Sequence, residues 1–311
     1  MNKKNIIKSG IIGYPLNYSI SPDIHNYLYE QAGIQGVYKE FRIRPEVFAE
    51  RIDAILKEYQ YLNVTIPYKK DIISHLQGTS DSARILGVVN TVACELGYNT
   101  DGMGLELALA EWPKPDHAMI IGAGNTSRTA LYTLLDLEIP NISLIHRNAN
   151  TLNKLKQEFA EVIKVKVLSA RSFASIATDQ QISFLDNPEE IFGFDQKIDL
   201  LINTTSAGMY PEIDQIPLPE EIIQHILIES KPRVFDVVYN PIRTKLLKMA
   251  TERELEIKNG LSMLFYQAYA SQSIWLDKQY SVEKAEKLWK SFVEKFNPEK
   301  FIVENWSVKK I

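Results

Sequence analysis

The feature that most constrains this chain is a short apolar strand that leads through a glycine-containing turn into a helix. Residues 118–121 are Ala-Met-Ile-Ile, residues 122–127 are Gly-Ala-Gly-Asn-Thr-Ser, and Leu131, Leu134 and Leu135 follow at helical spacing. In a doubly wound parallel sheet this order binds the pyrophosphate of a dinucleotide at the helix N-terminus. Ser127 occupies the place of the usual third glycine. The run predicts a nucleotide site, and the alternative is a structural turn.

The next predicted strand, residues 142–145, ends at His146, Arg147 and Asn148. Enzymes that use the unphosphorylated cofactor usually carry an acidic residue here for the ribose hydroxyls, and this run has none. Arg147 is instead suited to a 2′-phosphate, because a guanidinium forms paired hydrogen bonds with phosphate oxygens. We therefore expect NADP in preference to NAD. The alternative is an ordinary exposed arginine at a strand end.

Residues 63–69, Asn-Val-Thr-Ile-Pro-Tyr-Lys, place a lysine just beyond another predicted strand. Val64 and Ile66 alternate with polar residues, which is strand periodicity, and Pro67 favours the end of the strand. Open α/β sheets bind their ligands at strand ends, so Lys69 is a candidate functional residue. The alternative is a solvated lysine at the start of a surface helix.

Three other polar positions are candidate site residues, and the first of them is a candidate partner for Lys69. Residues 99–102, Asn-Thr-Asp-Gly, are typical of a turn with a helix cap, but an aspartate close to a lysine holds it in place and sets its proton affinity. Residues 88–92, Val-Val-Asn-Thr-Val, predict a short strand that carries Asn90. In a helix near the C-terminus, Gln267 shares one face with apolar residues, so its amide requires a partner.

Two serines lie at the start of a helix near the N-terminus. Ser21 before Pro22 fits an N-cap followed by proline at the first helical position, and Ser19 lies two residues earlier. Hydroxyl groups beside the free N–H groups of a helix N-terminus form a site for a carboxylate. The alternative is plain capping.

Length and composition limit the class of protein. A chain of 311 residues is long enough for two cores. The net charge of −4, without a long basic run, gives no reason to expect nucleic acid or an acidic membrane surface. No apolar run approaches about 20 residues, and the N-terminus lacks the apolar core of a signal peptide. With one cysteine, Cys94, and five histidines without ligand spacing, we expect a cytoplasmic protein without a metal site.

Strands and helices alternate on both sides of a Trp-Pro-Lys-Pro break at residues 112–115, which predicts an α/β chain. We expect an N-terminal α/β substrate domain of residues 1–102 and 261–311. A Rossmann-type doubly wound dinucleotide-binding domain of residues 103–260 is expected beside it, with a cleft between the two. In that domain a helix over 152–159 and a strand over 162–167 are expected, and the polar stretch 169–196 has no assignment.

Together these motifs resemble those of the shikimate dehydrogenase family, over about Gly10 to Ala270. The match includes the serine pair before proline, the Asn-Val-Thr-Ile-Pro-Tyr-Lys, Asn-Thr-Asp-Gly and Gly-Ala-Gly runs, and the Asn-Thr-Thr-Ser-Ala-Gly-Met loop of residues 203–209. The resemblance implies Lys69 and Asp101 as catalytic residues. It implies contacts to the substrate from Ser19, Ser21, Asn63, Thr65, Asn90 and Gln267. It implies contacts to the cofactor from Gly122, Gly124, Asn125, Thr126, Ser127, Arg147, Thr205, Met209 and Gly260.

The sequence also departs from the family pattern. Asn125 stands where the last glycine of a Gly-Ala-Gly-Gly run is usual, although asparagine tolerates the left-handed conformation better than most residues. His146 stands where asparagine is common, and Thr151 where a second phosphate-binding arginine is often found. This smaller basic cluster leaves NAD open as a cofactor. Between Val92 and Asn99 the chain is shorter than the family norm.

The resemblance implies a reversible, NADP-dependent reduction of 3-dehydroshikimate to shikimate, in the biosynthesis of chorismate and the aromatic amino acids, by a monomer or homodimer. A lysine with its ordinary pKa of about 10.4 is charged at neutral pH and fit to donate a proton to a carbonyl oxygen. One alternative is a quinate/shikimate dehydrogenase that uses NAD as readily as NADP. Another is a regulatory protein that binds a shikimate-like metabolite without chemistry. A folate-linked dehydrogenase fits less well, because its ligand does not call for paired serines at a helix start.

Overall fold

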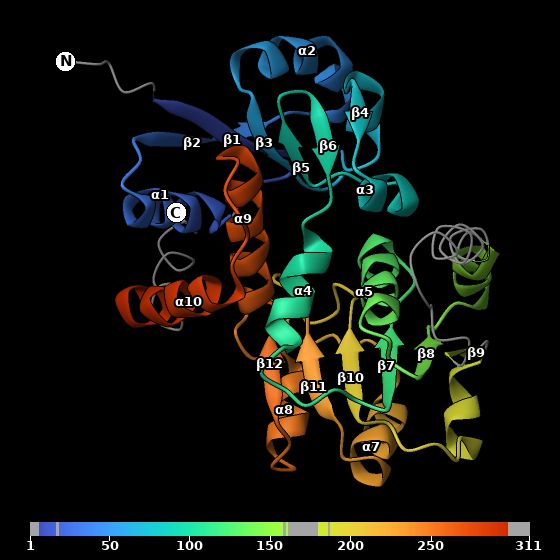
Figure 1. Ribbon diagram of the computed structural model, residues 1–311. Helices are drawn as coiled ribbons and strands as arrows, with labels where there is room; N and C mark the ends of the chain where they lie inside the picture. The colour runs from blue at the N-terminus through green and yellow to red at the C-terminus, as the bar shows by residue number, and fades with distance from the viewer. Residues whose placement is uncertain (1–5, 17–18, 158–159, 161–179, 186, 298–311) are drawn as a thin grey trace. The chain divides into compact units, whose positions relative to one another are not determined.

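The computed structural model describes residues 6–16, 19–157, 160, 180–185 and 187–297 of the chain. The chain divides into two compact units, which we call unit 1 (residues 1–107 and 264–311) and unit 2 (residues 108–263). Each unit is built around a six-stranded sheet with helices packed against it (Figure 1). The α/β class expected from the alternation of strands and helices is confirmed.

The sheet of unit 2 has the strand order β12-β11-β10-β7-β8-β9, and its strands lie side by side in Figure 1. Every pairing in it is parallel. Counted along the chain from the β9 edge, the order is 3-2-1-4-5-6, the doubly wound order of dinucleotide-binding domains. The predicted Rossmann-type sheet is therefore confirmed. Its strands are β7 (His117–Ile121), β8 (Asn141–Ile145), β9 (Gln181–Leu185), β10 (Leu200–Asn203), β11 (Arg233–Asp236) and β12 (Ile257–Asn259).

Apolar residues on these strands form the core of unit 2. β7 is buried along its whole length, as expected for a parallel strand covered on both faces. Met119 and Ile121 of β7 pack in one cluster with α7 (Glu220–Glu229) and α8 (Lys245–Thr251). The helix α5 (Asn125–Asp136) follows β7 directly and packs against it. The glycine-containing turn is thus held between a buried strand and a packed helix.

The segment after β8 is described only in part. Residues 149–157 are helical, which matches the start of the helix expected over 152–159. The strand expected over 162–167 lies outside the described residues. Within the stretch that had no assignment, the structure places β9 and the short helix η3 (Pro188–Gly193).

The sheet of unit 1 has the order β2-β1-β3-β5-β6-β4. β1 pairs in parallel with β2 and β3, whereas β5 runs antiparallel to both β3 and β6. The strands are β1 (Ile7–Gly13), β2 (Gly36–Arg42), β3 (Tyr61–Val64), β4 (Gly78–Thr79), β5 (Thr91–Ala93) and β6 (Leu96–Tyr98). The helices are α1 (Ser21–Ala32), η1 (Pro45–Val47), α2 (Phe48–Glu58), η2 (Asp71–His75), α3 (Asp81–Leu86), α4 (Asp101–Leu109), α9 (Leu261–Trp275) and α10 (Val282–Phe296).

Residues 88–92 do not form the continuous strand that the sequence predicts. β5 begins only at Thr91, and Asn90 precedes it. The peptide oxygen of Asn90 accepts a hydrogen bond from Val64 N at 2.8 Å, and its own N–H donates to Tyr98 O. The short connection from β5 to β6 is a hairpin whose two turn residues, Cys94 and Glu95, have φ of 49° and 63°.

Aromatic contacts join the C-terminal helices to α1. The ring of Tyr27 lies 5.3 Å from that of Phe292 and 6.3 Å from that of Phe265, measured between centroids. The hydroxyl of Tyr27 donates to the peptide oxygen of Leu288 on α10. Because Tyr27 and Phe292 are almost fully buried, these contacts make the last two helices part of the unit 1 core.

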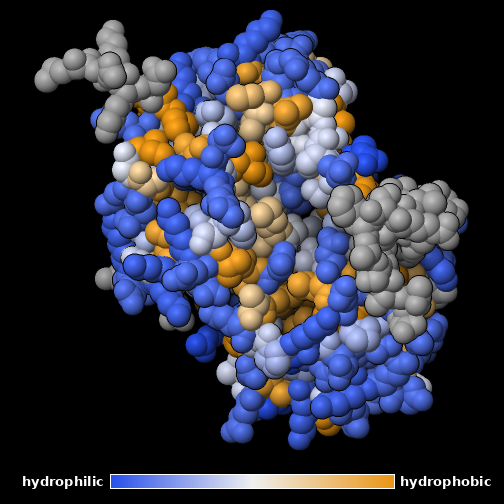
Figure 2. All heavy atoms as spheres, in the orientation of Figure 1, coloured by the Kyte–Doolittle hydropathy of each residue, from blue (hydrophilic) through white to orange (hydrophobic). Residues whose placement is uncertain are grey.

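Hydrophilic residues cover most of the face shown in Figure 2, and hydrophobic residues gather in smaller areas between them. Within the described ranges, no helix has both the length and the apolar character needed to cross a bilayer. The same residues contain no group of three or more histidine, cysteine, aspartate or glutamate side chains arranged to hold a metal ion.

Gly260, between β12 and α9, occupies a position that only glycine fits. A Cβ at this residue would lie 1.9 Å from the peptide oxygen of Val237. We expect Gly260→Ala to lower the free energy of unfolding by about 1 to 3 kcal/mol, because the backbone must move to admit the methyl group. Gly193→Ala, where a Cβ meets nothing within 4 Å, is the matched control and should change stability little. Urea unfolding of the two variants measures the difference, and equal midpoints would contradict the expected clash.

Candidate active site

The side chains of Lys69 and Asp101 meet in unit 1. Lys69 lies in the turn after β3, where Tyr68 N donates to Thr65 O and Val89 N donates to Lys69 O. Asp101 is the first residue of α4. The ammonium Nζ of Lys69 donates to Asp101 Oδ2 at 2.5 Å, and each side chain is 20% exposed. Two groups 32 positions apart in the chain thus form an ion pair that solvent still reaches.

Asn90 connects this ion pair to the buried interior. Its amide nitrogen donates to the second carboxylate oxygen of Asp101 at 2.7 Å. Its side-chain oxygen accepts from the backbone N–H of Thr100 at 2.8 Å. Gln267 on α9 lies at the edge of the same network, with Oε1 at 3.4 Å from Asn90 Nδ2. The partner that the buried amide of Gln267 requires is therefore supplied by the protein.

Asn63, at the end of β3, is the other buried amide of the network and is 5% exposed. Its nitrogen donates to Thr91 Oγ1 at 3.2 Å and to Ser271 Oγ at 3.0 Å. Its oxygen accepts from the hydroxyl of Tyr38 at 2.8 Å. The substrate residues implied by the resemblance on β3, before β5 and on α9 therefore lie in one hydrogen-bonded cluster.

The cluster also contains residues that sequence reasoning missed. Thr91, Thr100 and Ser271 are fully buried and bond to one another through their hydroxyls at 2.8 to 3.2 Å. The only sequence signal for Ser271 is its position four residues after Gln267, on the same helix face. Tyr38 was likewise not singled out from the sequence.

The serine pair departs from the predicted capping geometry. Ser21 is the first residue of α1 and not its N-cap, and the N-cap is Ile20, which makes no side-chain cap bond. Instead Ser19 Oγ accepts the backbone N–H of Ser21 at 3.3 Å. The prediction that Ser21 is the N-cap was wrong, because the helix already begins at Ser21 and Ile20 takes the N-cap position. Ser21 itself is 4% exposed.

Thr65, the remaining candidate in unit 1, lies just past β3 and is partly buried. Its methyl group sits over Gly13 at the end of β1, where a Cβ would come within 2.5 Å of it. Its N–H donates to Ile12 O. The ends of β1 and β3 are thereby held side by side next to the turn that carries Lys69.

In unit 2 the predicted phosphate loop lies at the switch point of the sheet, where β7 and β10 are neighbours and the chain crosses in opposite directions. Ser127 Oγ is 3.1 Å from the N–H of Gly124 and 2.7 Å from Thr204 Oγ1. Gly122 has φ of 133°, and a Cβ there would meet both hydroxyls at less than 3 Å. Serine at position 127 therefore closes the loop where the usual pattern has glycine.

The exposed side of this loop is open. Gly124 is exposed, and a Cβ there would meet nothing within 4 Å. Asn125 and Thr126 begin α5, so their N–H groups belong to the free helix N-terminus. Asn125 is helical and does not need the left-handed conformation that asparagine tolerates. Room beside Gly124 and free donors beyond it fit a pyrophosphate group.

Arg147 is exposed in the turn that follows β8. On either side of it, His146 Nδ1 accepts from Asn148 N at 3.1 Å, and Asn148 Oδ1 accepts from Thr151 N at 3.2 Å. Asn148 thus bonds to the first turn of the helix over residues 149–157. The guanidinium stands next to a helix N-terminus, and both features favour an anion.

The loop after β10 carries the other cofactor candidates. Asn203 Oδ1 accepts from both the N–H and the hydroxyl of Thr205, at 3.0 and 2.8 Å. Asn203 Nδ2 in turn donates to Asp236 at 2.9 Å. Met209 lies further along this loop and is 45% exposed. Gly260 follows β12 in the tight contact described above.

Two strongly perturbed groups near this loop were not singled out from the sequence. Burial raises the pKa of Asp236 to about 6, although Thr244, Val238 and Asn203 all donate to its carboxylate. Burial also raises the pKa of Tyr239 to about 12. Asp236 is the last residue of β11 and Tyr239 follows it by three positions, at the strand end where ligands of such sheets bind.

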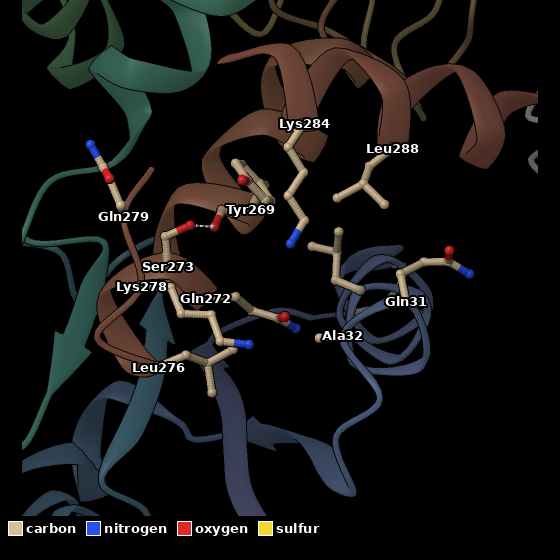
Figure 3. Close-up of a pocket in the computed structure, with 11 residues that line it drawn as sticks. Gln31, Ala32, Tyr269, Gln272, Ser273, Leu276, Lys278, Gln279, Lys284 and Leu288 are labelled. Atoms are coloured by element: carbon tan, nitrogen blue, oxygen red, sulfur yellow. Dashed lines mark hydrogen bonds between the residues drawn. The ribbon is translucent and has the colours of Figure 1, made fainter. Parts of the chain in front are cut away.

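A separate pocket of about 40 Å³ lies between α1, α9 and α10 in unit 1 (Figure 3). Lys278 and Lys284 stand at its rim, and Tyr269, Gln272 and Ser273 line it from α9. No residue proposed above for the substrate or the cofactor lines this pocket. It is therefore distinct from the cluster around Lys69.

Comparisons with known proteins identify the family to which this chain belongs. Residues 11–92 match the family model described as the shikimate dehydrogenase substrate binding domain. A shikimate dehydrogenase (NADP(+)) of Clostridium beijerinckii is 35% identical over 92% of this chain and 98% of its own length. The chain belongs to the shikimate dehydrogenase family.

Solved structures of shikimate dehydrogenase relatives share the fold over nearly the whole chain. A chorismate mutase/shikimate 5-dehydrogenase fusion protein from Clostridium acetobutylicum superposes with a TM-score of 0.74 at 30% identity, over 94% of this chain and 98% of that one. A shikimate dehydrogenase solved in complex with NADP⁺ gives a TM-score of 0.72 at 32% identity, over 91% of this chain and 94% of the other. The two-domain build of the family thus extends across both units.

The raised pKa of Asp236 predicts a pH-dependent contribution to stability. Because the folded-state pKa exceeds the ordinary value of 3.8, protonation favours the folded state. This contribution is complete below about pH 4 and is lost as the pH rises through about 6. We expect the unfolding free energy of Asp236→Asn, relative to the unmodified protein, to rise by about 2 kcal/mol from pH 4 to pH 7. Urea unfolding across that range measures it, and parallel pH curves would contradict the assignment.

Proposed function

We propose that this chain is an NADP-dependent shikimate dehydrogenase that reversibly reduces the ring ketone of 3-dehydroshikimate to the hydroxyl of shikimate. Membership of the family supports this activity. The observation that carries the mechanism is the Lys69–Asp101 ion pair beside the buried amides of Asn63, Asn90 and Gln267. That arrangement supplies one proton donor and several neutral hydrogen-bonding groups for a polyhydroxylated ring.

Lys69 acts as the general acid in reduction. Its ammonium group gives a proton to the carbonyl oxygen of the substrate, and in the reverse direction the neutral amine takes the proton from the hydroxyl. Asp101 accepts a hydrogen bond from Lys69 on one oxygen and from Asn90 on the other, so both the carboxylate and the ammonium are held in one orientation. A bound reduced nicotinamide supplies the hydride.

The remaining residues of unit 1 bind the substrate. Ser19 and Ser21, at the start of α1, hold the carboxylate with their hydroxyl groups, near the positive end of the helix dipole. Ring hydroxyls are bound by Asn63, Thr65, Asn90 and Gln267. Three of these four are buried side chains, and an amide that both donates and accepts matches a hydroxyl, which does the same.

Unit 2 binds the cofactor. Gly122, Gly124 and the first turn of α5 would hold the pyrophosphate, because Asn125, Thr126 and Ser127 provide N–H groups there and the helix dipole favours negative charge. Arg147 would bind the 2′-phosphate of NADP. Thr205, Met209 and Gly260 would supply further contacts to the cofactor. We assign substrate binding to the predicted domain of residues 1–102 and 261–311, and cofactor binding to the predicted domain of residues 103–260.

The partners of this enzyme are small molecules, and we place it in the cytoplasm as a monomer or homodimer. The single cysteine and the absence of a membrane-spanning helix among the described residues support that compartment. Size-exclusion chromatography with light scattering distinguishes the two oligomeric states.

Removal of Lys69 tests the mechanism. We expect Lys69→Ala to lower kcat for shikimate oxidation by about 10²- to 10⁴-fold, because a positioned general acid-base contributes that much. Lys70→Ala, which changes the adjacent exposed lysine, is the matched control and should retain turnover. Initial rates are followed by the absorbance of the reduced nicotinamide. Full turnover by Lys69→Ala would exclude the general acid role, and absence of activity in the unmodified enzyme with shikimate and NADP⁺ would exclude the function.

The ratio of kcat/KM for shikimate to that for quinate tests the substrate. We assign shikimate, so the ratio should be well above one with either cofactor. A ratio near one would instead indicate a quinate/shikimate dehydrogenase.

Cofactor choice depends on Arg147. We expect Arg147→Gln to raise the KM for NADP⁺ by about tenfold or more and to leave the KM for NAD⁺ nearly unchanged, because only NADP carries the 2′-phosphate. A charge-assisted hydrogen bond is worth about 1.5 to 3 kcal/mol, which corresponds to this range. Arg243→Gln, on a different loop of unit 2, serves as the control for loss of a positive charge. An equal rise in the KM for NADP⁺ and the KM for NAD⁺ would show that Arg147 does not bind the 2′-phosphate.

A further inference from the structure

Asp236 is a buried carboxylate that the mechanism above does not use. It is the last residue of β11, and the strand register pairs it with Asn203, the last residue of the neighbouring strand β10 (Figure 1). Both residues are 0% exposed. An ionised group away from water is costly, so its presence at this strand end requires a physical account.

Three donors converge on this carboxylate. Its Oδ1 accepts from Asn203 Nδ2 at 2.9 Å and from the backbone N–H of Val238 at 3.1 Å, and its Oδ2 accepts from the hydroxyl of Thr244 at 2.6 Å. The orientation of the Asn203 amide is fixed, because its oxygen accepts from the N–H of Thr205, which can only donate. An ionised carboxylate only accepts, so it satisfies all three donors at once. An amide or a protonated acid would present a hydrogen to one of them.

The first donor leads to the loop after β10. Asn203 Oδ1 accepts from both the N–H and the hydroxyl of Thr205, and that hydroxyl accepts from Ala207 N at 3.2 Å. The start of the loop is therefore built on Asn203, whose amide is held in turn by Asp236. These donors are used inside the loop, so the carboxylate fixes the course of the loop backbone.

The second donor supports the other end of the same loop. Thr244 packs beside Gly208, where an added Cβ would lie 3.2 Å from the Cβ of Thr244. Gly208 has φ of 84°, a left-handed conformation that suits glycine, and it directly precedes Met209. The hydroxyl bond to Asp236 therefore holds a side chain that packs against the turn carrying Met209.

The third donor leads to the loops after β11 and β12. Val238 donates its N–H to Asp236, and its peptide oxygen accepts the N–H of Gly260 at 3.2 Å. The carboxylate is thus connected, through short chains of contacts within unit 2, to the cofactor candidates that lie outside the phosphate loop and Arg147. These candidates are Thr205, Met209 and Gly260.

The charge of this group opposes the stability of the fold. Desolvation raises the pKa of Asp236 to about 6, and within the described part of the chain the groups that oppose this effect are the three neutral donors. The adjacent titratable side chain, Tyr239, is a neutral phenol whose pKa burial raises to about 12. Asp236 is therefore ionised at pH 8 and neutral at pH 5, and its ionisation destabilises the folded state. A gain in stability does not account for a carboxylate at this position.

We propose that Asp236 is a positioning residue for the dinucleotide, whose carboxylate accepts its three donors together and so holds the loops after β10, β11 and β12 in the arrangement that binds the cofactor. The inference rests on the proposed function, because it takes Thr205, Met209 and Gly260 as cofactor contacts. Negative charge on Asp236 strengthens cofactor binding while it weakens the fold.

Asp236→Asn tests this role, because it keeps the shape of the side chain but presents a hydrogen to one of the donors. We expect the variant to raise the Kd for NADP⁺ about 3- to 10-fold at pH 8, the effect of one hydrogen bond. The KM for shikimate at saturating NADP⁺ should stay nearly unchanged. At pH 5 the ratio of the two Kd values should fall below about twofold, because Asp236 of the unmodified protein is then also neutral. Isothermal titration calorimetry measures both values.

Asp199→Asn is the matched control. Asp199 precedes β10, at the opposite end of the strand, and its carboxylate accepts the backbone N–H groups of Asp116 and His117. This variant should leave the Kd for NADP⁺ unchanged at both pH values. A rise equal to that of Asp236→Asn would show that any lost carboxylate of this sheet has the same effect, and would overturn the proposal.

A purely structural role of Asp236 predicts a different result. Relative to the unmodified protein, Asp236→Asn should gain stability in urea as the pH rises, while its affinity for NADP⁺ should fall. Affinity that follows stability at each pH, or a Kd ratio that stays constant from pH 5 to pH 8, would overturn the proposal. Thr244→Val, which removes one donor, should also weaken NADP⁺ binding, whereas Thr244→Ser, which keeps the hydroxyl, should retain most of it. Equal Kd values of these two variants would contradict the role of the hydroxyl bond.

The outcomes separate this inference from the proposed function. If the unmodified protein does not bind NADP⁺, the proposed function fails and the inference fails with it. If the unmodified protein binds NADP⁺ and Asp236→Asn binds it equally well at pH 8, only the inference fails.

A measurement on the unmodified protein does not depend on how the variants fold. The ¹³C resonance of the Asp236 carboxyl should titrate near pH 6 in the free protein. Because ionisation and cofactor binding favour each other, saturating NADP⁺ should lower this midpoint to between about pH 5 and about pH 5.5, which is the logarithm of the expected affinity ratio. A midpoint that NADP⁺ leaves unchanged or raises would overturn the proposal.

Discussion

The candidate site depends on one buried amide, that of Asn90. Its nitrogen donates to Asp101 and its oxygen accepts the backbone N–H of Thr100, while its own peptide group joins the ends of β3 and β6. An amide suits this position because it donates and accepts at the same time, which neither a carboxylate nor an ammonium can do. Through Asn90 the strand ends, the start of α4 and the face of α9 are connected, and the ion pair of Lys69 and Asp101 is presented at the margin of a buried network.

Such a network tolerates few changes, because every buried member must find partners. Thr91, Thr100 and Ser271 supply hydroxyl groups that can act as donor or acceptor as their neighbours require. The charged groups lie at the partly exposed edge, and the neutral groups lie inside. This arrangement is favourable, because the desolvation penalty of an ion pair is smaller where water still reaches it.

The candidate cofactor site of unit 2 is formed in a different way. Its parallel sheet places the ends of β7 and β10 next to each other, and the loops that follow must therefore pack together. Contact between Ser127 and Thr204 joins these loops, and Gly122 is required because a side chain would displace both hydroxyls. The N-terminus of α5 stays open for an anion as a result.

Much of this was predictable from the sequence, because the signals are local. The strand, turn and helix around residues 118–136 and the lysine after residues 63–66 follow from periodicity and from the positions of glycine and proline. The predictions that were wrong concern positions decided by a neighbour. Ser21 was expected to cap a helix, but it is the first helical residue, and its backbone N–H donates to Ser19 Oγ. Asn90 was expected within a strand, yet it precedes β5, which begins at Thr91, and its peptide group bonds to Val64 and Tyr98.

The sequence by itself determined which chemical groups are available and roughly which strand end or helix start carries each one, since both depend on residues close together in the chain. Only the tertiary structure decided which of them share hydrogen bonds. Tyr38, Thr91 and Ser271 carry no signal as single residues. Their meeting at Asn63 depends on strand register and on the packing of α9, which are set by contacts between residues 25 to 208 positions apart. Burial, the property that makes His25 neutral and Asp236 hard to ionise, likewise arises only when distant segments exclude water together.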